Sequence, residues 1–339
     1  MGGDRLWSRS ARLRCALLVV LAWLSIAGAA RAQVLDPGDA ISRISARDIT
    51  ESLVSLNNFT ASPGIEGSNL STDLGDGQPN LEYGRFSIQI PISIQTRLSW
   101  LNVYTEIGYG SLFVDDRFFA RTLAGETLAI FSERQVDSGR LGLGVEWRPT
   151  TGWQIAPYLA ASVSGLSSKT RFAGGNFDPG SISPVEQVLL SDWSAAAWSL
   201  GGVLDVKYLR WFGVERNRLD LQARYAISWT ETFNESLRIL DTSDLRNTLV
   251  FEALWRSITD VRVFKKRLSW NVFANSTSFP GQDKDDLGFT YYFGLGAGVD
   301  LYIPERLWGK IGRNFIGIRG SAIVGDDVRG WSIVLSLRN

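Results

Sequence analysis

The feature that most constrains the fold of this chain is a period-two alternation of apolar with polar or small residues. From Phe289 to Ile303 every second residue is apolar, and the positions between hold Thr, Tyr, Gly and Asp. Because successive side chains of a β-strand point to opposite faces, this pattern predicts strands with one apolar face. Nine other segments alternate in the same way: Phe86–Gln95, Leu101–Tyr109, Arg140–Trp147, Trp153–Val163, Ala196–Tyr208, Arg218–Thr230, Leu249–Arg256, Leu268–Asn275 and Trp331–Arg338.

Two all-β architectures are built from strands of this kind. A soluble sandwich turns the apolar faces inward, whereas an outer-membrane barrel turns them outward to lipid and encloses a polar lumen. Less regular strands in Phe59–Asp73 and Gly312–Val324 bring the expected total to about twelve, an even number that suits a transmembrane antiparallel β-barrel. The barrel is therefore the predicted fold, and the periplasmic sandwich is the alternative.

Charged residues and glycines share the face opposite the apolar one. Glycines such as Gly294, Gly296 and Gly298 suit the crowded inner wall of a curved lumen. Both signs of charge are interspersed, so we expect ion pairs that close the lumen or a pore of weak ion selectivity. The charged residues expected to face the lumen, as structural partners or as pore lining, are Arg140, Glu146, Asp205, Lys207, Asp220, Arg224, Glu252, Arg256, Asp300 and Arg319.

Connections between the predicted strands are alternately short and long, as are the periplasmic turns and extracellular loops of outer-membrane barrels. The short set comprises Arg97–Trp100, Arg148–Gly152, Leu209–Asn217, Ser257–Lys266 and Pro304–Gly312. The long set comprises Asp116–Val136, Ser167–Asp192 and Thr232–Leu245. The turn Lys265-Lys266-Arg267 is expected to be an interfacial charge cluster.

Tryptophans fall near the ends of the predicted strands. This is where the two aromatic belts of a membrane barrel lie, at the two boundaries between lipid and water. The tryptophans expected in these belts are Trp100, Trp147, Trp153, Trp193, Trp211, Trp229, Trp255, Trp270, Trp308 and Trp331.

The chain divides into three parts by sequence. Residues 1–32 are predicted to be a cleaved signal peptide, because arginines precede an apolar run that ends in the cleavage motif Ala30-Arg31-Ala32. Residues 33–58 carry Ile and Leu at roughly helical spacing, so this segment either enters the lumen as a helix or lies solvated in the periplasm. Residues 59–339 are predicted to form the barrel.

Composition excludes several classes of function. There is no histidine, and the single cysteine, Cys15, lies in the predicted signal peptide. Residues 33–339 therefore cannot hold a His-based triad, a disulfide or a thiolate nucleophile, and we expect no enzyme, catalytic residue, cofactor or metal site. The first 32 residues hold five arginines and one aspartate, which leaves 30 basic and 34 acidic residues. A net charge of about −4 argues against nucleic acid as a partner.

The closing stretch resembles a known family. Gly294-Leu-Gly-Ala-Gly298 with Asp300, the turn Gly325-Asp326-Asp327 and Gly330-Trp-Ser-Ile333 are similar to the solitary outer-membrane autotransporter-like β-barrel domains. The resemblance covers roughly residues 59–339 and implies a twelve-stranded barrel with a helix through the lumen, here without a passenger domain. Such barrels usually end in an aromatic residue that the barrel-assembly machinery reads, whereas this chain ends Leu337-Arg338-Asn339.

The sequence thus predicts an integral outer-membrane barrel of a Gram-negative bacterium, with outer-membrane lipids and the barrel-assembly machinery as partners. We expect it to act as a pore or translocator or as a structural membrane protein. The alternative is an adhesin-like surface barrel that binds an extracellular ligand through its long loops. A barrel enzyme is a third, weaker hypothesis, because it would have to work without histidine.

Overall fold

A computed structural model of the chain describes residues 53–54, 56–58, 64–72, 80–121, 127–173, 192–213, 216–236, 243–281, 287–303 and 315–338. The chain divides into two compact units, residues 1–36 and 37–339, and every described residue belongs to the second. Outside the described residues lie the expected signal peptide, residues 33–52, Trp308 and residues 174–191, which are most of the expected loop 167–192.

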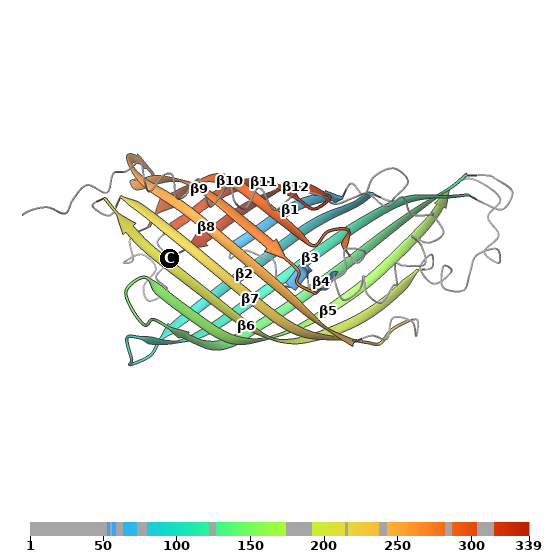
Figure 1. Ribbon diagram of the computed structural model, residues 1–339, viewed down its shortest axis with the longest axis horizontal. Coiled ribbons are helices and arrows are strands. Elements are labelled where there is room, and N and C mark those ends of the chain that lie inside the picture. Colours follow the sequence, from blue (N-terminus) through green and yellow to red (C-terminus); the bar gives the residue numbers. More distant parts are fainter. Residues whose placement is uncertain are drawn as a thin grey trace, which may run out of the picture. The chain divides into compact units, whose positions relative to one another are not determined.

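The second unit is a closed barrel of twelve antiparallel strands, as predicted. Each strand pairs with its neighbours in sequence, and β1 pairs with β12 to close the sheet (Figure 1). Unpaired backbone groups at a sheet edge are very unfavourable in a membrane, and a closed barrel has no such edge. The strands are β1 (Gly64–Thr72), β2 (Asn80–Gln95), β3 (Leu101–Arg121), β4 (Thr127–Trp147), β5 (Trp153–Ala173), β6 (Trp193–Phe212), β7 (Asn217–Phe233), β8 (Ser243–Val263), β9 (Lys266–Ser278), β10 (Tyr291–Tyr302), β11 (Phe315–Gly325) and β12 (Val328–Arg338).

The two ends of the barrel differ. At one end, here called the turn end, short connections join β2 to β3, β4 to β5, β6 to β7 and β8 to β9, and β1 begins and β12 ends. The other end is called the loop end. Connections at the loop end range from two residues between β11 and β12 to 19 between β5 and β6, so the expected alternation of short and long connections holds only in part.

Several strands are longer than the alternation indicated. β3, β4 and β5 have 21 residues each, so most of the expected loop 116–136 is strand, with only 122–126 between β3 and β4 outside the described residues. β8 likewise continues to Val263, so the expected turn 257–266 is mostly a hairpin. Strands extend here because backbone pairing can continue beyond the apolar stripe on which the prediction depended.

The direction of the apolar face separates the two architectures. Leu141, Leu159 and Leu295 are 64%, 66% and 71% exposed, although they lie in the middle of their strands. Arg256 and Glu106 are instead fully buried in the interior. A soluble sandwich would bury the leucines, so this arrangement of faces is that of a transmembrane barrel.

A short piece of the N-terminal segment is described as well. Leu53, Val54, Leu56, Asn57 and Asn58 are helical and buried. No helix among the described residues is long and apolar enough to cross a membrane.

Candidate functional site

Glu106 is the centre of the first charged cluster inside the barrel. It lies on β3, and its carboxylate oxygens are 3.2 Å from Arg140 Nη2 and 3.4 Å from Arg224 Nη2. The hydroxyls of Tyr104 and Tyr158 donate hydrogen bonds to it over 3.1 and 3.3 Å. Because β3 and β7 are not neighbours in the sheet, the contact with Arg224 crosses the interior of the barrel.

Asp205 on β6 extends this cluster towards the turn end. Arg224 Nη2 also lies 3.2 Å from its carboxylate, and Gln222 Nε2 donates to both of its oxygens over 2.9 and 3.0 Å. Lys207 Nζ is 3.5 Å away and partly exposed. Arg224 thus bridges two buried carboxylates on different strands and fixes them relative to each other.

Asp300 on β10 is the centre of a second cluster, whose members come from β7 to β11. Arg256 Nε lies 2.9 Å from Asp300 Oδ2, and Asn271 Nδ2 donates to the same oxygen over 2.8 Å. Arg319 Nη2 is 4.0 Å away, and its other terminal nitrogen is 3.6 Å from Glu252. Charges of both signs are therefore neutralised locally.

Aromatic rings cover the arginines of the second cluster near the turn end. Arg218 forms a two-point ion pair with Asp220, over 2.5 and 2.7 Å, and Asp220 also lies 3.4 Å from Arg256 Nη1. The guanidinium carbon of Arg256 is 3.8 Å from the centre of the Phe315 ring, and that of Arg218 is 5.1 Å from it. Contact with a ring face partly replaces the water that these cations lose.

All ten charged residues that we expected on the lumen face lie on that face. Eight are buried, whereas Lys207 and Glu252 are partly exposed, and each of the ten has an ion-pair or hydrogen-bond partner. Glu146, near the turn end, pairs with Arg148 over 2.6 Å and accepts a hydrogen bond from Asn102. The arrangement is therefore one of local pairs rather than a lining of one sign.

Sequence reasoning missed the residue with the most partners in the first cluster. Glu106 alternates with Asn102 and Tyr104 on one face of the predicted strand 101–109, so its parity already placed it inward. Arg218 and Arg85 were also not selected, and both are buried on the inward face. The period-two rule could have found all three, whereas their partners depend on contacts across strands.

Glycines make room for the large inward side chains. A Cβ on Gly298 would lie 2.7 Å from Arg319 Cγ, and one on Gly296 would lie 2.5 Å from the Phe273 ring. A Cβ on Gly317 would lie 2.0 Å from Asp300 Oδ1. These distances are shorter than van der Waals contact, so the glycines of β10 and β11 are required for side chains of adjacent strands to lie flat across the wall.

The described end of the N-terminal segment is hydrogen-bonded to the inner wall. Asn57 Nδ2 lies 3.1 Å from Gly110 O, 3.3 Å from Val136 O and 3.1 Å from Ser138 Oγ. Asn58 Nδ2 donates to an oxygen on β5, Ser162 Oγ, over 3.0 Å.

Arg140 of the first cluster also donates to the backbone oxygen of Asn58. The segment is thus held by polar contacts to β3, β4 and β5, and one of them connects it directly to the charged cluster. Buried polar groups that are paired in this way specify one position of the segment.

An apolar girdle surrounds the same segment, which corrects the expectation of a wholly polar lumen. Leu53, Val54 and Leu56 are at most 1% exposed. Full burial of an aliphatic side chain contributes roughly 1.5–3 kcal/mol. The wall residues of this girdle are Leu70, Tyr83, Leu112, Val114, Val136, Leu166, Trp193, Ala195, Ala197, Tyr292, Ile323 and Val328.

The connection between β9 and β10 closes the girdle on the loop side. Phe279, Leu287 and Phe289 are buried in it, and Tyr83 OH donates to Leu287 O over 2.7 Å. The ring of Phe289 packs edge-on against those of Tyr83 and Tyr292, with 5.8 and 6.0 Å between ring centres. Phe289 therefore packs inside the barrel, and its expected place on the outward apolar face was wrong because β10 begins only at Tyr291.

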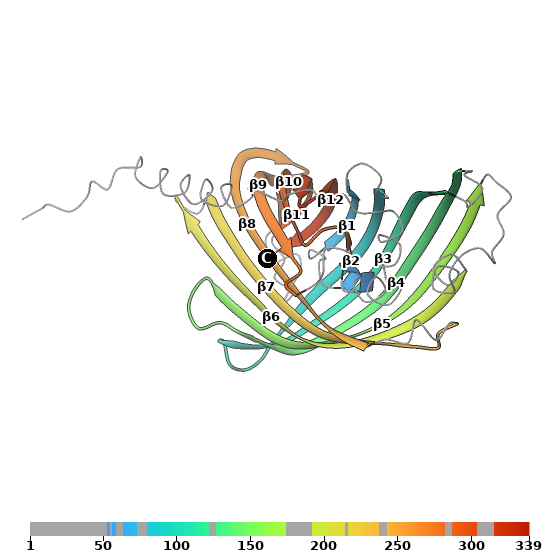
Figure 2. The same cartoon turned by 45° about the vertical axis from the view of Figure 1, so that its right-hand side comes forward.

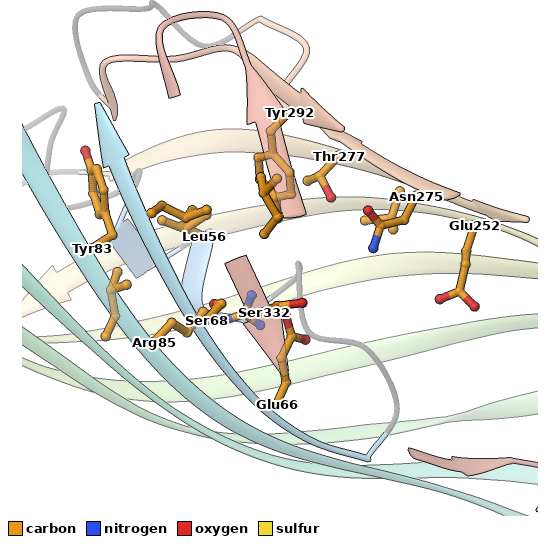
Figure 3. A pocket seen from close by; sticks show the side chains of 14 residues that line it. Leu56, Glu66, Ser68, Tyr83, Arg85, Glu252, Asn275, Thr277, Tyr292 and Ser332 are labelled. Carbon is orange, nitrogen blue, oxygen red and sulfur yellow. The ribbon is translucent and has the colours of Figure 1, made fainter. Parts of the chain in front are cut away.

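Little empty space remains at this level. A cavity of about 30 Å³ lies beside Leu56, between the girdle and the polar wall (Figure 3). That volume holds about one or two water molecules. Polar groups on its wall include Glu66, Arg85 and Glu252. At the level of the girdle, the space left beside the described end of the N-terminal segment is therefore small.

The tryptophans divide between the two faces. Trp147, Trp153, Trp229, Trp270 and Trp331 are 41–52% exposed on the outward face, and Trp100 is similarly exposed in the first short turn. Trp255 is partly buried and contacts the Phe212 ring at 5.7 Å.

Two tryptophans depart from the expected belts. Trp193 is 6% exposed and belongs to the apolar girdle. Trp211 pairs with the inward residue Arg218 and lies 5.5 Å from its guanidinium carbon, so it faces the mouth of the lumen. Both residues do lie near the end of a strand, as expected. Their places in the alternation of the strand, however, direct their side chains inward.

No cluster of three or more His, Cys, Asp or Glu side chains suited to a metal ion occurs within the described ranges. No protein-family model matches the chain, and no curated protein matches it.

Among solved structures, the chain is similar to the translocator domain of the autotransporter NalP from Neisseria meningitidis, with 13% identity and a TM-score of 0.46 over 87% of this chain and 94% of that one. It is similar to the β domain of the Bordetella autotransporter BrkA, with 15% identity and a TM-score of 0.43 over 80% and 97%. It is also similar to the transport unit of the autotransporter AIDA-I from Escherichia coli, with 10% identity and a TM-score of 0.42 over 86% and 98%. All three are autotransporter barrels, the class that the sequence resembles.

Proposed function

We propose that the chain is an integral outer-membrane barrel of a Gram-negative bacterium, exported by residues 1–32, and that it is a pore or translocator closed by its own N-terminal segment. The observation that carries the proposal is the position of Leu53–Asn58 inside the girdle. This segment is held by side-chain hydrogen bonds and by burial of three aliphatic groups, rather than by continuous pairing with the sheet. Such a segment can leave while the strand pairing of the barrel stays intact.

The charged clusters support a lumen with little ion selectivity. The second cluster contains Arg218, Arg256 and Arg319 with Asp220, Asp300 and Glu252, three charges of each sign. Locally neutral pairs produce little net field along the lumen. If the segment withdraws, we expect a conducting state with little preference between anions and cations.

A reversible tether tests this proposal in the full chain. An ideal Cβ on Gly110 lies 3.0 Å from Asn57 Cγ. Since Cγ is one bond from Cβ, the two Cβ atoms would lie within about 4.5 Å, which a disulfide can bridge. The variant Asn57→Cys with Gly110→Cys is expected to be silent in planar bilayers when oxidised and to conduct after reduction. Each single variant is the control, because it alters one contact without a tether.

Absence of current in every redox state and in every variant would contradict the pore and leave a structural role. Heat-modifiable migration of the same preparations reports separately whether a folded barrel is present. Deletion of residues 33–58 adds a third arm, in which current without redox dependence is expected.

A surface-binding role is supported by one different observation. β3, β4 and β5 are about twice as long as the 9–11 residues that span a bilayer. Towards the loop end, their outward residues include several charged ones: Asp115, Glu133, Lys169 and Arg171. This stem would carry the connections at the loop end away from the membrane. Shortening β3 and β4 together without any change in cell adhesion would count against an adhesin-like role.

A further inference from the structure

The β8–β9 hairpin differs from the other short connections in its charge. Residues 258–268, here called the basic hairpin, contain Arg262, Lys265, Lys266 and Arg267 against the single acid Asp260, a net charge of +3. The turns 96–100, 148–152 and 213–216 contain one basic residue each, and residues 303–314 contain three basic residues and one acid, a net charge of +2. The remainder of the chain after residue 32 is acidic, and the basic hairpin carries the highest net positive charge of the short connections.

The basic hairpin also extends past its neighbour in the sheet. β8 is paired with the first residue of β7, Asn217, at Ser257, and then continues for six residues to Val263. The pairing of β8 with β9 is irregular between Ile258 and Arg262, where β8 holds two extra residues. A bulge of this kind bends a strand, and Figure 2 shows the end of β8 curving round into β9.

One face of the basic hairpin continues the lipid-facing surface. Trp270 is paired with Ser257 on the outward face, and counting along β9 by twos places Lys266 on the same face, opposite Val263. Val261 is 57% exposed, and Phe264, at the tip, is 86% exposed. An apolar stripe ending in an exposed ring and surrounded by basic residues is typical of a segment that lies in a membrane interface.

The two residues at the tip of the basic hairpin, Phe264 and Lys265, are of types that rarely adopt the backbone conformation of this turn. Phe264 and Lys265 have φ angles of 50° and 63°, both in the left-handed region. A two-residue hairpin turn of this geometry favours Asn-Gly, and a bulky aromatic residue is uncommon there. Strain of this kind persists where the side chains serve another purpose. We therefore attribute the presence of Phe264 and Lys265 at this turn to a contact outside the chain, because the turn geometry itself does not favour them.

We propose that the basic hairpin binds the anionic phospholipid headgroups of the leaflet at the turn end. Phe264 lies among the headgroups, and Lys265 at the tip and Lys266 on the outward face pair with phosphates. Arg262 and Arg267 pair with each other on the opposite face and add only to the local positive potential. The inference goes beyond pore function and requires only that the barrel is in a membrane. Lys266 lies on the same outward face of β9 as Trp270, four residues away. Because that face is the lipid-facing one in a membrane barrel, lipid is favoured over a soluble partner.

The test uses a nitroxide on the full chain. Residues 33–339 contain no cysteine, so Val261→Cys offers one labelling site in the mature protein. The collision rate of the label with a water-soluble nickel chelate is measured in phosphatidylcholine vesicles with and without phosphatidylglycerol. We expect the label to be shielded when phosphatidylglycerol is present and accessible when it is absent.

Three variants separate charge, tip and fold. Lys265→Ser with Lys266→Ser is expected to weaken binding to the anionic surface roughly thirtyfold, the effect of removing two basic side chains. The collision rate in phosphatidylglycerol should therefore rise to the rate in phosphatidylcholine. Phe264→Asn with Lys265→Gly relieves the turn, so it should fold at least as stably and still lose the shielding. The matched control is Lys169→Ser with Arg171→Ser, which removes the same charge at the opposite end and should leave the label shielded.

Two results would overturn the inference. One is a label that stays accessible to the chelate in both kinds of vesicle, and the other is shielding that survives the double lysine variant. A second label at Leu295→Cys distinguishes these failures from failure of the membrane barrel. If that label is also in water, the barrel proposal fails; if it is in lipid, only the assignment of the basic hairpin fails.

Discussion

The side-chain amide of Asn57 donates a hydrogen bond to the backbone oxygen of Gly110 over 3.1 Å, at a point of the wall where no side chain intervenes. A Cβ on residue 110 would lie 2.4 Å from Asn57 Oδ1. The position of the N-terminal segment therefore depends on a glycine in β3, more than 50 residues away in sequence. The four predictions below test this contact, the charged cluster and the two faces of the wall.

Gly110→Ala is expected to loosen the N-terminal segment without unfolding the barrel. The new methyl group meets the end of a movable side chain, so Asn57 can turn away, but it then loses its buried hydrogen bonds at a cost of about 1–3 kcal/mol. More frequent openings in planar bilayers, with unchanged heat-modifiable migration, are the expected result. Gly139→Ala is the control, because nothing lies within 4 Å of its Cβ, and equal opening rates for the two variants would contradict the contact.

Glu106→Gln is expected to destabilise the barrel by about 3–5 kcal/mol. The substitution leaves Arg140 and Arg224 buried with one counter-charge fewer, and removing one partner of a buried pair is strongly unfavourable. The matched control is Glu133→Gln, whose ion pair with Arg171 is largely exposed and should contribute less than about 1 kcal/mol. Urea unfolding in detergent, followed by tryptophan fluorescence, measures both, and similar midpoints would show that the Glu106 cluster is dispensable.

Leu295→Arg is expected to cost about 2–4 kcal/mol, since Leu295 is the most exposed leucine among the described residues and lies in the middle of β10. Leu245→Arg should cost about 0–1 kcal/mol, because Leu245 pairs with Trp229 at the membrane boundary. Unfolding in lipid vesicles measures the two free energies. The assignment of the outward face would be wrong if the two arginines cost the same.

Quenching of tryptophan fluorescence by brominated lipid distinguishes the two faces directly. Trp229 is 42% exposed outward, so Trp229→Phe should remove part of the quenchable emission. Trp193 is enclosed in the girdle, so Trp193→Phe should reduce total emission while leaving the quenchable part unchanged. A loss of quenchable emission in the Trp193 variant would instead show that Trp193 faces lipid.

The sequence was sufficient for the fold because the evidence for it is local. Alternation along a strand is a property of consecutive residues, so segments such as Ala196–Tyr208 could be assigned without any knowledge of their neighbours. The inward parity of Asp205 and Lys207 follows from the same count. Strand ends were harder to place, since pairing in β3 and β4 continues where the apolar stripe has stopped.

The contents of the lumen could not be read in the same way. An apolar residue in an alternating strand looks identical whether it faces lipid or an inserted segment, and Trp193 was misplaced for that reason. Phe289 was misplaced because it lies before the start of β10. The partners of Glu106 come from β3, β4, β5 and β7, and the partner on β7, Arg224, reaches it only across the interior of the barrel.

What the sequence by itself determined is the alternation, and with it a barrel whose apolar residues face lipid and whose charges face inward. What only the tertiary structure decided is what lies in this interior: Asn57 and Asn58 hydrogen-bonded to the wall, an apolar girdle around Leu53 and Leu56, and arginines that join non-adjacent strands. The physical reason is that strand periodicity is set by the backbone within one segment, whereas filling a lumen depends on distances between segments far apart in the chain.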